Sequence, residues 1–277
     1  MITRKSIRRN IRQTIALAER NILFETRFKL YTIANFIGPI VQILMPLIIF
    51  GAIFSLNSAY SFGYWTSQNY FLFILLAFII QFLRQIIENF RFLFLREKYW
   101  KTLQALLVAP INRYVLLFGV LISEMILISI PIIFFFIVAI IVFPITFLNL
   151  LLVLIILASI SIIFGSIGLI LGIIFVTQEG VQRILKIGLT FVFWLSCISY
   201  PIQIFPEIVQ NVILINPFYY IIDLFRIVWL IGVDYNLAMS FLTPIHIILI
   251  CLLTFSLPVI SVYLFNKFYD KFGISGY

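Results

Sequence analysis

Few residues in this chain have side chains that could do chemistry, and the most informative stand inside or beside long apolar stretches. Arg84 and Glu88 have i,i+4 spacing, which puts both on one face of a helix. Glu124 follows Arg113 by about 16 Å of helix, at about 1.5 Å per residue. Ionisable groups this deep in apolar surroundings are costly, so they are usually paired or face a water-filled path. Two interpretations of Glu124 stay open. In the first, Glu124 is structural: it pairs with Arg84 or Ser123, or it lies on a helix end outside the lipid. In the second, Glu124 belongs to a substrate path or its gate.

The sequence lacks the motifs of common nucleotide- and metal-dependent enzymes. It has no Gly-x-x-x-x-Gly-Lys, Gly-x-Gly-x-x-Gly, His-Glu-x-x-His or Cys-x-x-Cys pattern. The single histidine, His246, is interpreted as a packed or hydrogen-bonded ring near the outer end of the last apolar stretch. Asp223, Asp234 and Asp270 fall outside the main expected spans, which argues against an intramembrane aspartyl protease. We therefore expect no catalytic residues, no metal site and no cofactor in this chain.

The elements that position these residues follow from composition. Hydrophobic residues make up 64% of the chain and charged residues 10%, which is typical of an integral membrane protein. Residues 30–83 and 125–178 contain no Asp, Glu, Lys or Arg. Each run is too long for one crossing of about 20 residues and fits two. Two more apolar stretches, 187–205 and 242–265, bring the expected number of spans to six.

The predicted organisation is a single all-α transmembrane domain over residues 1–277. Its parts are an interfacial helix at 1–30, spans 1 and 2 in 31–90, a cytoplasmic loop at 91–113, spans 3 and 4 in 114–178, span 5 at 187–205, an outer region at 206–241, span 6 at 242–266 and a tail at 267–277.

The distribution of cations predicts the orientation. Of the 19 Lys and Arg residues, 18 fall in segments expected on one face, and Arg226 falls on the other. The positive-inside rule then places both termini in the cytoplasm, with the protein in the cell (inner) membrane. Topology and anionic lipid account for the formal charge of +9, so no nucleic-acid partner is expected.

Two further patterns predict helix faces. Ile11, Ile15 and Ala18 recur at helical spacing opposite Arg8 and Arg12, as in an uncleaved helix lying in the membrane interface. A disordered basic tail is the alternative. The small residues of the fourth span form a stripe that allows close approach of another helix, either within the chain or at a subunit interface. These residues are Ser161, Gly165, Gly168 and Gly172.

The loop after the second span resembles the signature Arg-Glu-x-x-x-Thr-Leu-x-x-Leu-Leu-Val-x-Pro-x-x-Arg of permease subunits of type 2 ABC exporters, in the drug, lipooligosaccharide and polysaccharide branch. The matching positions are Arg96, Glu97, Thr102, Leu103, Leu106, Leu107, Val108, Pro110 and Arg113. The outer segment, with Pro201, Phe205-Pro206 and Asn216-Pro217 before Arg226, is also similar to that family. Phe205 stands where leucine is commoner.

The resemblance implies that residues 97–108 form a coupling helix that docks on a separate ATPase subunit. The residues assigned to this contact are Glu97, Lys101, Thr102, Leu103, Leu106, Leu107, Pro110 and Arg113, with the leucines as an apolar knob and Pro110 as the stop. It also implies short re-entrant outer helices broken at Pro206 and Pro217; a simple outer loop is the alternative. The residues assigned to the translocation path or gate are Arg84, Glu88, Glu124, Phe205, Pro206, Asn216 and Pro217.

We therefore expect the permease of an ATP-driven exporter that moves an amphipathic, lipid-linked or glycan substrate. Its expected partners are a second copy of itself, two copies of an ABC ATPase that binds ATP and magnesium, and membrane lipid. A non-transporting membrane anchor or assembly subunit is the alternative, and a membrane-embedded transferase is a third possibility.

Overall fold

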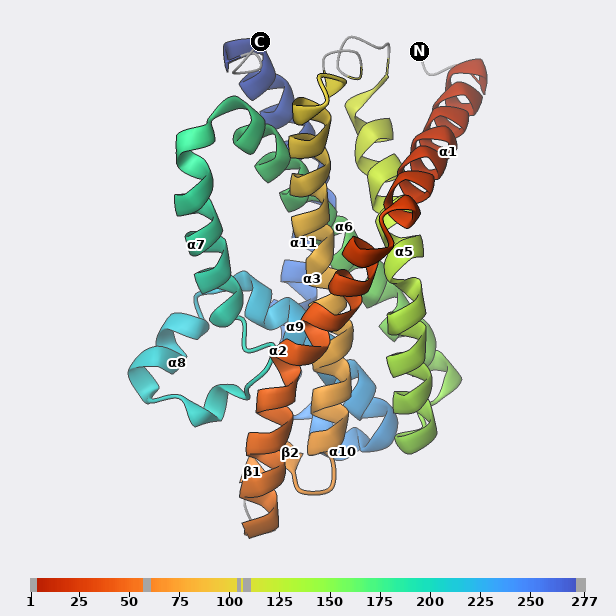
Figure 1. The fold of residues 1–277 in the computed structure, drawn as a ribbon. Coiled ribbons are helices and arrows are strands. Elements are labelled where there is room, and N and C mark those ends of the chain that lie inside the picture. Colours follow the sequence, from red (N-terminus) through yellow and green to blue (C-terminus); the bar gives the residue numbers. More distant parts are fainter. Residues whose placement is uncertain (1–3, 57–60, 104–105, 107–110, 273–277) are drawn as a thin grey trace.

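A computed structural model describes residues 4–56, 61–103, 106 and 111–272, which form a bundle of antiparallel helices (Figure 1). The elements are α1 (Arg4–Arg27), α2 (Lys29–Leu56), β1 (Ser61–Phe62), β2 (Trp65–Thr66), α3 (Tyr70–Tyr99), α5 (Arg113–Val142), α6 (Phe147–Thr177), η1 (Glu179–Val181), α7 (Gln182–Trp194), η2 (Ile202–Ile204), α8 (Glu207–Ile213), α9 (Pro217–Val233), α10 (Tyr235–Met239) and α11 (Pro244–Phe272).

The long helices run between two ends of the molecule. The start of α1 and the end of α11 lie at one end, here named the termini end, and the β1–β2 hairpin lies at the other, the hairpin end (Figure 1). Among the described residues, α2, α3, α5, α6 and α11 contain segments long and apolar enough to cross a membrane, and α8 with α9 forms a sixth candidate bent by 90°. The fold is therefore that of an all-α integral membrane protein.

Helix α3 is the centre of the bundle, and its neighbour α6 approaches it through the predicted small-residue stripe. A Cβ atom added at Gly168 would lie 2.7 Å from the Cβ of Phe90. One added at Gly172 would lie 2.3 Å from the ring of Phe94. Glycine is needed here because any side chain would occupy the space of these rings. The stripe therefore packs inside the chain, which resolves the alternative left open by the sequence.

Polar caps mark where several of these apolar helices begin. The side chain of Asn112 accepts a hydrogen bond from the backbone N–H of Tyr114 at 3.0 Å, and Thr146 accepts one from Asn149 at 3.4 Å. At the start of α9, Asn216 accepts a hydrogen bond from the N–H of Phe218, and Pro217 occupies the first turn. Such caps satisfy N–H groups that the helix itself leaves without partners.

The structure differs from the sequence prediction at the fifth apolar stretch, residues 187–205. Helix α7 begins earlier, at Gln182, and ends at Trp194, and turns and the short η2 follow it. Its 13 residues are fewer than the about 20 that a crossing requires. The absence of charge up to Phe205 hid this break, although Ser196, Ser199 and Pro201 after Trp194 are residues that weaken a helix.

Helix α1 confirms the predicted N-terminal helix, and part of its apolar side packs on the bundle. Leu17 and Ala18 are buried, and Leu17 lies against Gly119 of α5. Ile11 and Ile15, on the apolar side predicted to lie in the membrane interface, are 54% and 59% exposed and so can contact lipid. Ile7 has the same helical spacing as Ile11 and Ile15, but its side chain lies outside the described part of the chain.

Candidate functional site

A groove with polar walls opens between α2, α3 and α7, on a molecule whose surface is otherwise largely apolar. It consists of a cavity of about 530 Å³ and an adjoining cavity of about 230 Å³. Both are lined by Gln42 of α2, Gln81 and Arg84 of α3, and Thr190 of α7. We call this feature the polar groove. It brings together amide, hydroxyl and guanidinium groups, which can bind hydroxyl and anionic groups of a solute.

The predicted residues Arg84 and Glu88 both line the polar groove, but their contacts differ from those expected. The guanidinium of Arg84 lies over the ring of Phe193, 5.0 Å from its centroid. Glu88 forms its ion pair with Arg91, one turn further along α3. The i,i+4 spacing therefore places Arg84 and Glu88 on one face, while the ion pair of Glu88 goes to another arginine.

Glu124 is fully buried between α5 and α3 and does not line the polar groove. The side-chain amide of Asn89 donates a hydrogen bond to its Oε2 at 2.5 Å. The partners proposed from sequence were wrong: Arg84 faces the groove, and the hydroxyl of Ser123 donates to the carbonyl of Val120. This location favours the structural interpretation of Glu124 over a place in the path.

At the termini end, the motif residue Glu97 lies in the last turn of α3 and joins three segments. Its carboxylate accepts a hydrogen bond from Arg20 of α1 at 2.8 Å and one from the hydroxyl of Thr102 at 2.5 Å. The next residue back, Arg96, pairs with Glu25 of α1 at 3.4 Å. Burial raises the pKa of Glu25, although the adjacent Arg96 acts in the opposite direction.

The predicted apolar knob of the coupling segment is buried in this chain. Leu103 is 0% and Leu106 is 7% exposed, so neither presents a free surface to a partner. The exposed residues of this turn are Lys101 and Thr102. The spacing of the leucines correctly predicted an apolar side of this segment. It did not predict what that side contacts, because the same spacing fits packing on an external partner or on the bundle of this chain.

Three other residues assigned to coupling have different outcomes. Leu107 and Pro110 lie outside the described residues. Arg113, at the start of α5, lies over the rings of Phe265 and Tyr269 of α11, at 5.3 Å and 5.7 Å. Arg113 therefore connects two helices of the bundle at the termini end.

The predicted outer helices begin where the prolines predicted. Pro206 precedes α8 and Pro217 opens α9, and the axes of these helices meet at 90°. The amide of Asn216, at the bend, donates to the carbonyl of Val192 at 2.8 Å. Phe205 packs edge-on against Trp194, with ring centroids 5.9 Å apart. The bend is thus fastened to the last turn of α7, beside the polar groove.

Sequence reasoning missed a buried polar cluster at the hairpin end, formed by Tyr64, Asp223, Arg226 and His246. Tyr64 donates a hydrogen bond to Asp223, and burial, followed by the charge of Asp223, raises the pKa of the Tyr64 phenol. His246 Nε2 lies 3.5 Å from the second oxygen of Asp223. Arg226 donates to the backbone carbonyls of Cys197 and Ile198 at 3.0 Å and 2.5 Å.

This cluster joins the hairpin, α9, α11 and the turn after α7. The sequence placed Asp223 and Arg226 in the outer region and interpreted His246 as a packed or hydrogen-bonded ring, but it did not predict that these residues meet. The signal that could have found them is the charged pair within the apolar run 217–233, because buried charges need partners.

The five apolar helices, the bent α8–α9 pair and the polar groove define a multi-pass membrane protein with a polar surface beside its spans. A family model described as ABC-2 type transporter matches residues 12–230, well over half of the chain, so this chain belongs to that family. It is the membrane permease of an ABC transporter, a transport subunit and not a catalytic one. Permeases of this family typically work with an ATPase subunit. The search of curated proteins found no match.

Proposed function

We propose that this permease exports an amphipathic, lipid-linked or glycan substrate through the polar groove, driven by a separate ATPase. The observation that carries the proposal is the groove itself, with Arg84 and three glutamine side chains along helices that are otherwise apolar. Intramembrane polar groups of this kind mark substrate pathways in membrane proteins. The positive-inside rule supports cytoplasmic termini, and the resemblance of the loop after the second span to type 2 ABC exporters supports export as the direction.

The chemistry of the groove supports this substrate class. Amide groups of Gln42, Gln81 and Gln85 can donate to and accept from sugar hydroxyls, while Arg84 suits a phosphate or carboxylate. Trp194 and Tyr200 line the second cavity, and aromatic faces pack on sugar rings and acyl chains. One wall alone cannot enclose a substrate, so we propose that a second copy closes the groove.

The exposed face of α7 supports pairing of two copies. Ile184, Ile187 and Trp194 are 71%, 71% and 57% exposed along one side of this short helix. In a dimer, two such faces would flank a shared path lined by both polar grooves. We propose two permease copies and two ATPase subunits, with ATP and magnesium bound by the ATPase.

The exposed turn at Lys101 and Thr102 is the proposed contact with the ATPase. Lys101 has a positive φ of 58°, which turns the chain sharply after α3. Glu97 ties this turn to α1, and Leu103 anchors it on the bundle. Motion of the turn would therefore be passed to α1 and α3 together.

Transport by the reconstituted complex tests this function. Arg84→Gln should reduce ATP-dependent uptake of a lipid-linked glycan into inside-out vesicles by about tenfold or more, because a charge-assisted hydrogen bond contributes about 1.5–3 kcal/mol. The matched control is Arg183→Gln, an exposed arginine at the start of α7 outside the groove. Uptake unchanged by Arg84→Gln would reject the groove as the path.

The coupling contact has its own variants. Lys101→Glu should release the ATPase during co-purification while the permease stays folded. Leu103→Asp should instead lower permease stability, because it places a carboxylate in the core. If the complex is recovered equally with Lys101→Glu and no transport is detected for any substrate, the non-transporting anchor becomes the better interpretation.

A further inference from the structure

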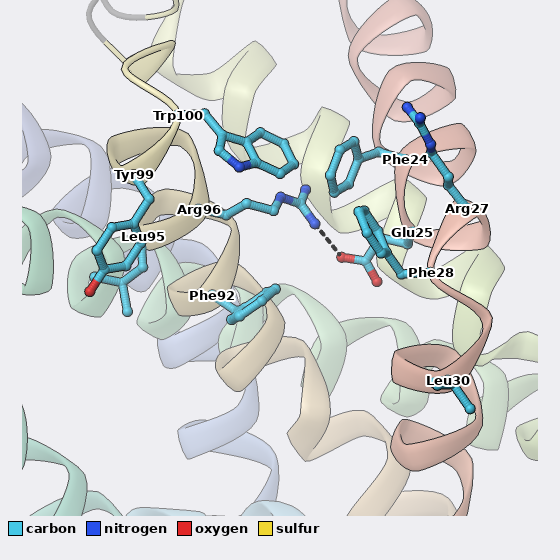
Figure 2. Close-up of a pocket in the computed structure, with 10 residues that line it drawn as sticks. All are labelled: Phe24, Glu25, Arg27, Phe28, Leu30, Phe92, Leu95, Arg96, Tyr99 and Trp100. Carbon is cyan, nitrogen blue, oxygen red and sulfur yellow. Dashed lines mark hydrogen bonds and ion pairs between the residues drawn. The ribbon is translucent and has the colours of Figure 1, made fainter.

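A second, separate pocket lies between the end of α1 and the end of α3, at the termini end of the bundle (Figure 2). Its volume is about 770 Å³, within the range of ligand-binding sites in proteins. Its walls are mainly apolar and aromatic, contributed by Phe24, Phe28, Phe92, Leu95 and Trp100. We call it the interfacial pocket. It shares Phe92 with the polar groove and lies further along the same face of α3, toward its C-terminal end.

The depth of the interfacial pocket follows from the helices that form it. The charge-free run that contains α2 begins at Leu30, after Lys29, and the end of α3 carries Arg96, Glu97 and Lys98. The pocket lies between these ends, where lipid headgroups meet the hydrocarbon. Tyr99 and Trp100, which are 80% and 46% exposed, are the residue types enriched at this level. Apolar walls at this depth offer few hydrogen-bond partners to water, so lipid acyl chains are expected to contact them.

Charge distinguishes this pocket from an ordinary lipid-facing surface. Arg96 extends into it, stacked on Phe24 at 3.8 Å and paired with the buried Glu25 (Figure 2). Arg27 stands at the rim, and it forms no ion pair with any residue that the structure describes. One guanidinium, that of Arg96, therefore lies inside the pocket with the Glu25 carboxyl group, and that of Arg27 lies at its outer edge (Figure 2). The same helix carries Arg8, Arg9 and Arg12 on its exposed side.

We propose that the interfacial pocket binds one anionic phospholipid of the adjacent leaflet. The phosphate lies at the rim beside Arg27, and an acyl chain lies against Phe28, Phe92 and Leu95. Because the pocket joins α1 to α3 next to the Glu97 turn, the bound lipid stabilises the contact between these two helices. The proposal does not rest on the path proposed for the exported substrate.

Lipid titration followed by native mass spectrometry tests the site. The detergent-purified permease is titrated separately with phosphatidylglycerol and phosphatidylcholine of identical acyl chains. We expect one tightly retained phosphatidylglycerol and at least fivefold weaker retention of phosphatidylcholine, since one cation near the surface contributes about 1 kcal/mol of anionic-lipid affinity. Equal retention of the two lipids would overturn the anionic preference.

Two variants locate the lipid. Arg27→Gln should weaken phosphatidylglycerol binding about fivefold and leave phosphatidylcholine unchanged. Leu30→Asp places a negative charge in the pocket, and Leu30 is 84% exposed, so the fold should tolerate it. Its matched control is Leu56→Asp, at the other end of α2 and 85% exposed. Reduced binding in Leu30→Asp but not in Leu56→Asp supports the site; an equal effect of both overturns it.

Competition separates other occupants. Inorganic phosphate at millimolar concentration should not displace the phospholipid, because the acyl chain supplies much of the affinity; displacement would show a phosphate site without a lipid. Cross-linking between cysteines introduced at Tyr99 in two chains would show that a second copy covers the pocket. Displacement by an exported glycolipid would assign the pocket to the substrate. Each of these three results would overturn the proposal.

Discussion

The carboxylate of Glu124 is held between two transmembrane helices by a neutral amide. Its Oε2 accepts from Asn89, while its Oε1 has no hydrogen-bond partner among the described residues. A buried group with one satisfied oxygen specifies how α3 and α5 meet, because moving either helix would break the bond. This is the behaviour of a residue that positions helices.

Substituting Glu124 separates positioning from transport. Glu124→Gln keeps an oxygen for Asn89 and should hold the free energy of unfolding within about 1 kcal/mol of wild type, with normal transport. Glu124→Leu removes the acceptor and should destabilise by about 1–3 kcal/mol. Thermal unfolding of the purified permease measures both, with the exposed Glu19→Gln as control. Lost transport with unchanged stability in Glu124→Gln would return Glu124 to the path.

Arg226 can be tested through its neighbour Cys197. Burial raises the pKa of the Cys197 thiol to about 12, so it should react slowly with a membrane-permeant maleimide. Arg226→Ala frees the two carbonyls that hold this turn. The loss of the Arg226 charge by itself raises the thiol pKa, but burial is the larger cause of the raised pKa, so opening of the turn to water should dominate. Labelling of Cys197 in a Cys251→Ser background should therefore rise.

Arg226→Lys distinguishes geometry from charge in the same assay. A lysine cannot reproduce the two fixed donors of the guanidinium, so it should label faster than wild type and more slowly than the alanine variant. Unchanged labelling in both variants would show that Arg226 does not hold the turn.

Residue types predicted the groove better than they predicted contacts. Arg84 and Glu88 were placed on one face by spacing alone, and that face lines the groove. The partners of Glu124 and Glu97 lie on other helices, and single-sequence patterns contain no information on which helices touch. For the same reason, the Asp223 cluster could not be assembled from a sequence that scatters it over four elements.

At the scale of elements, spacing predicted helices well and their ends less well. The five long spans follow from charge-free length, and the breaks at Pro206 and Pro217 follow from the missing N–H and fixed φ of proline. The end of α7 follows from tertiary contacts instead. Arg226 and Asn216 bind carbonyls in and just after its last turn, which compensates for ending a helix in an apolar sequence.

The contact between α6 and α3 gives a prediction at this scale. Gly168→Ala should destabilise by about 1–3 kcal/mol, because its Cβ would lie 2.7 Å from Phe90 and 3.3 Å from the backbone of Ile87. The control is Gly188→Ala in α7, where no atom lies within 4 Å of the added Cβ. That control should be neutral or slightly stabilising, since alanine favours helix. Equal melting temperatures for both variants would contradict the close contact.

At the scale of the molecule, the cation distribution predicts which end faces the cytoplasm. Gly180 lies at the termini end, where an added side chain meets open space, and Gln68 is exposed at the hairpin end. In a background without Cys197 and Cys251, Gly180→Cys should be shielded from an impermeant maleimide in intact cells, and Gln68→Cys should react. Membrane disruption should make both react. The reverse pattern in intact cells would invert the topology.

The shortness of α7 has a consequence for the bilayer around a single copy. On that flank the apolar height is reduced, while Arg84 and the neighbouring amides face outward beside it. Lipid meeting a solitary subunit there would have to thin or admit water, which is a hydrophobic mismatch confined to one side. When two copies join through these flanks, the surface with the reduced apolar height no longer contacts lipid. The equilibrium between single and paired copies should therefore depend on bilayer thickness. Thinner bilayers should favour the single copy.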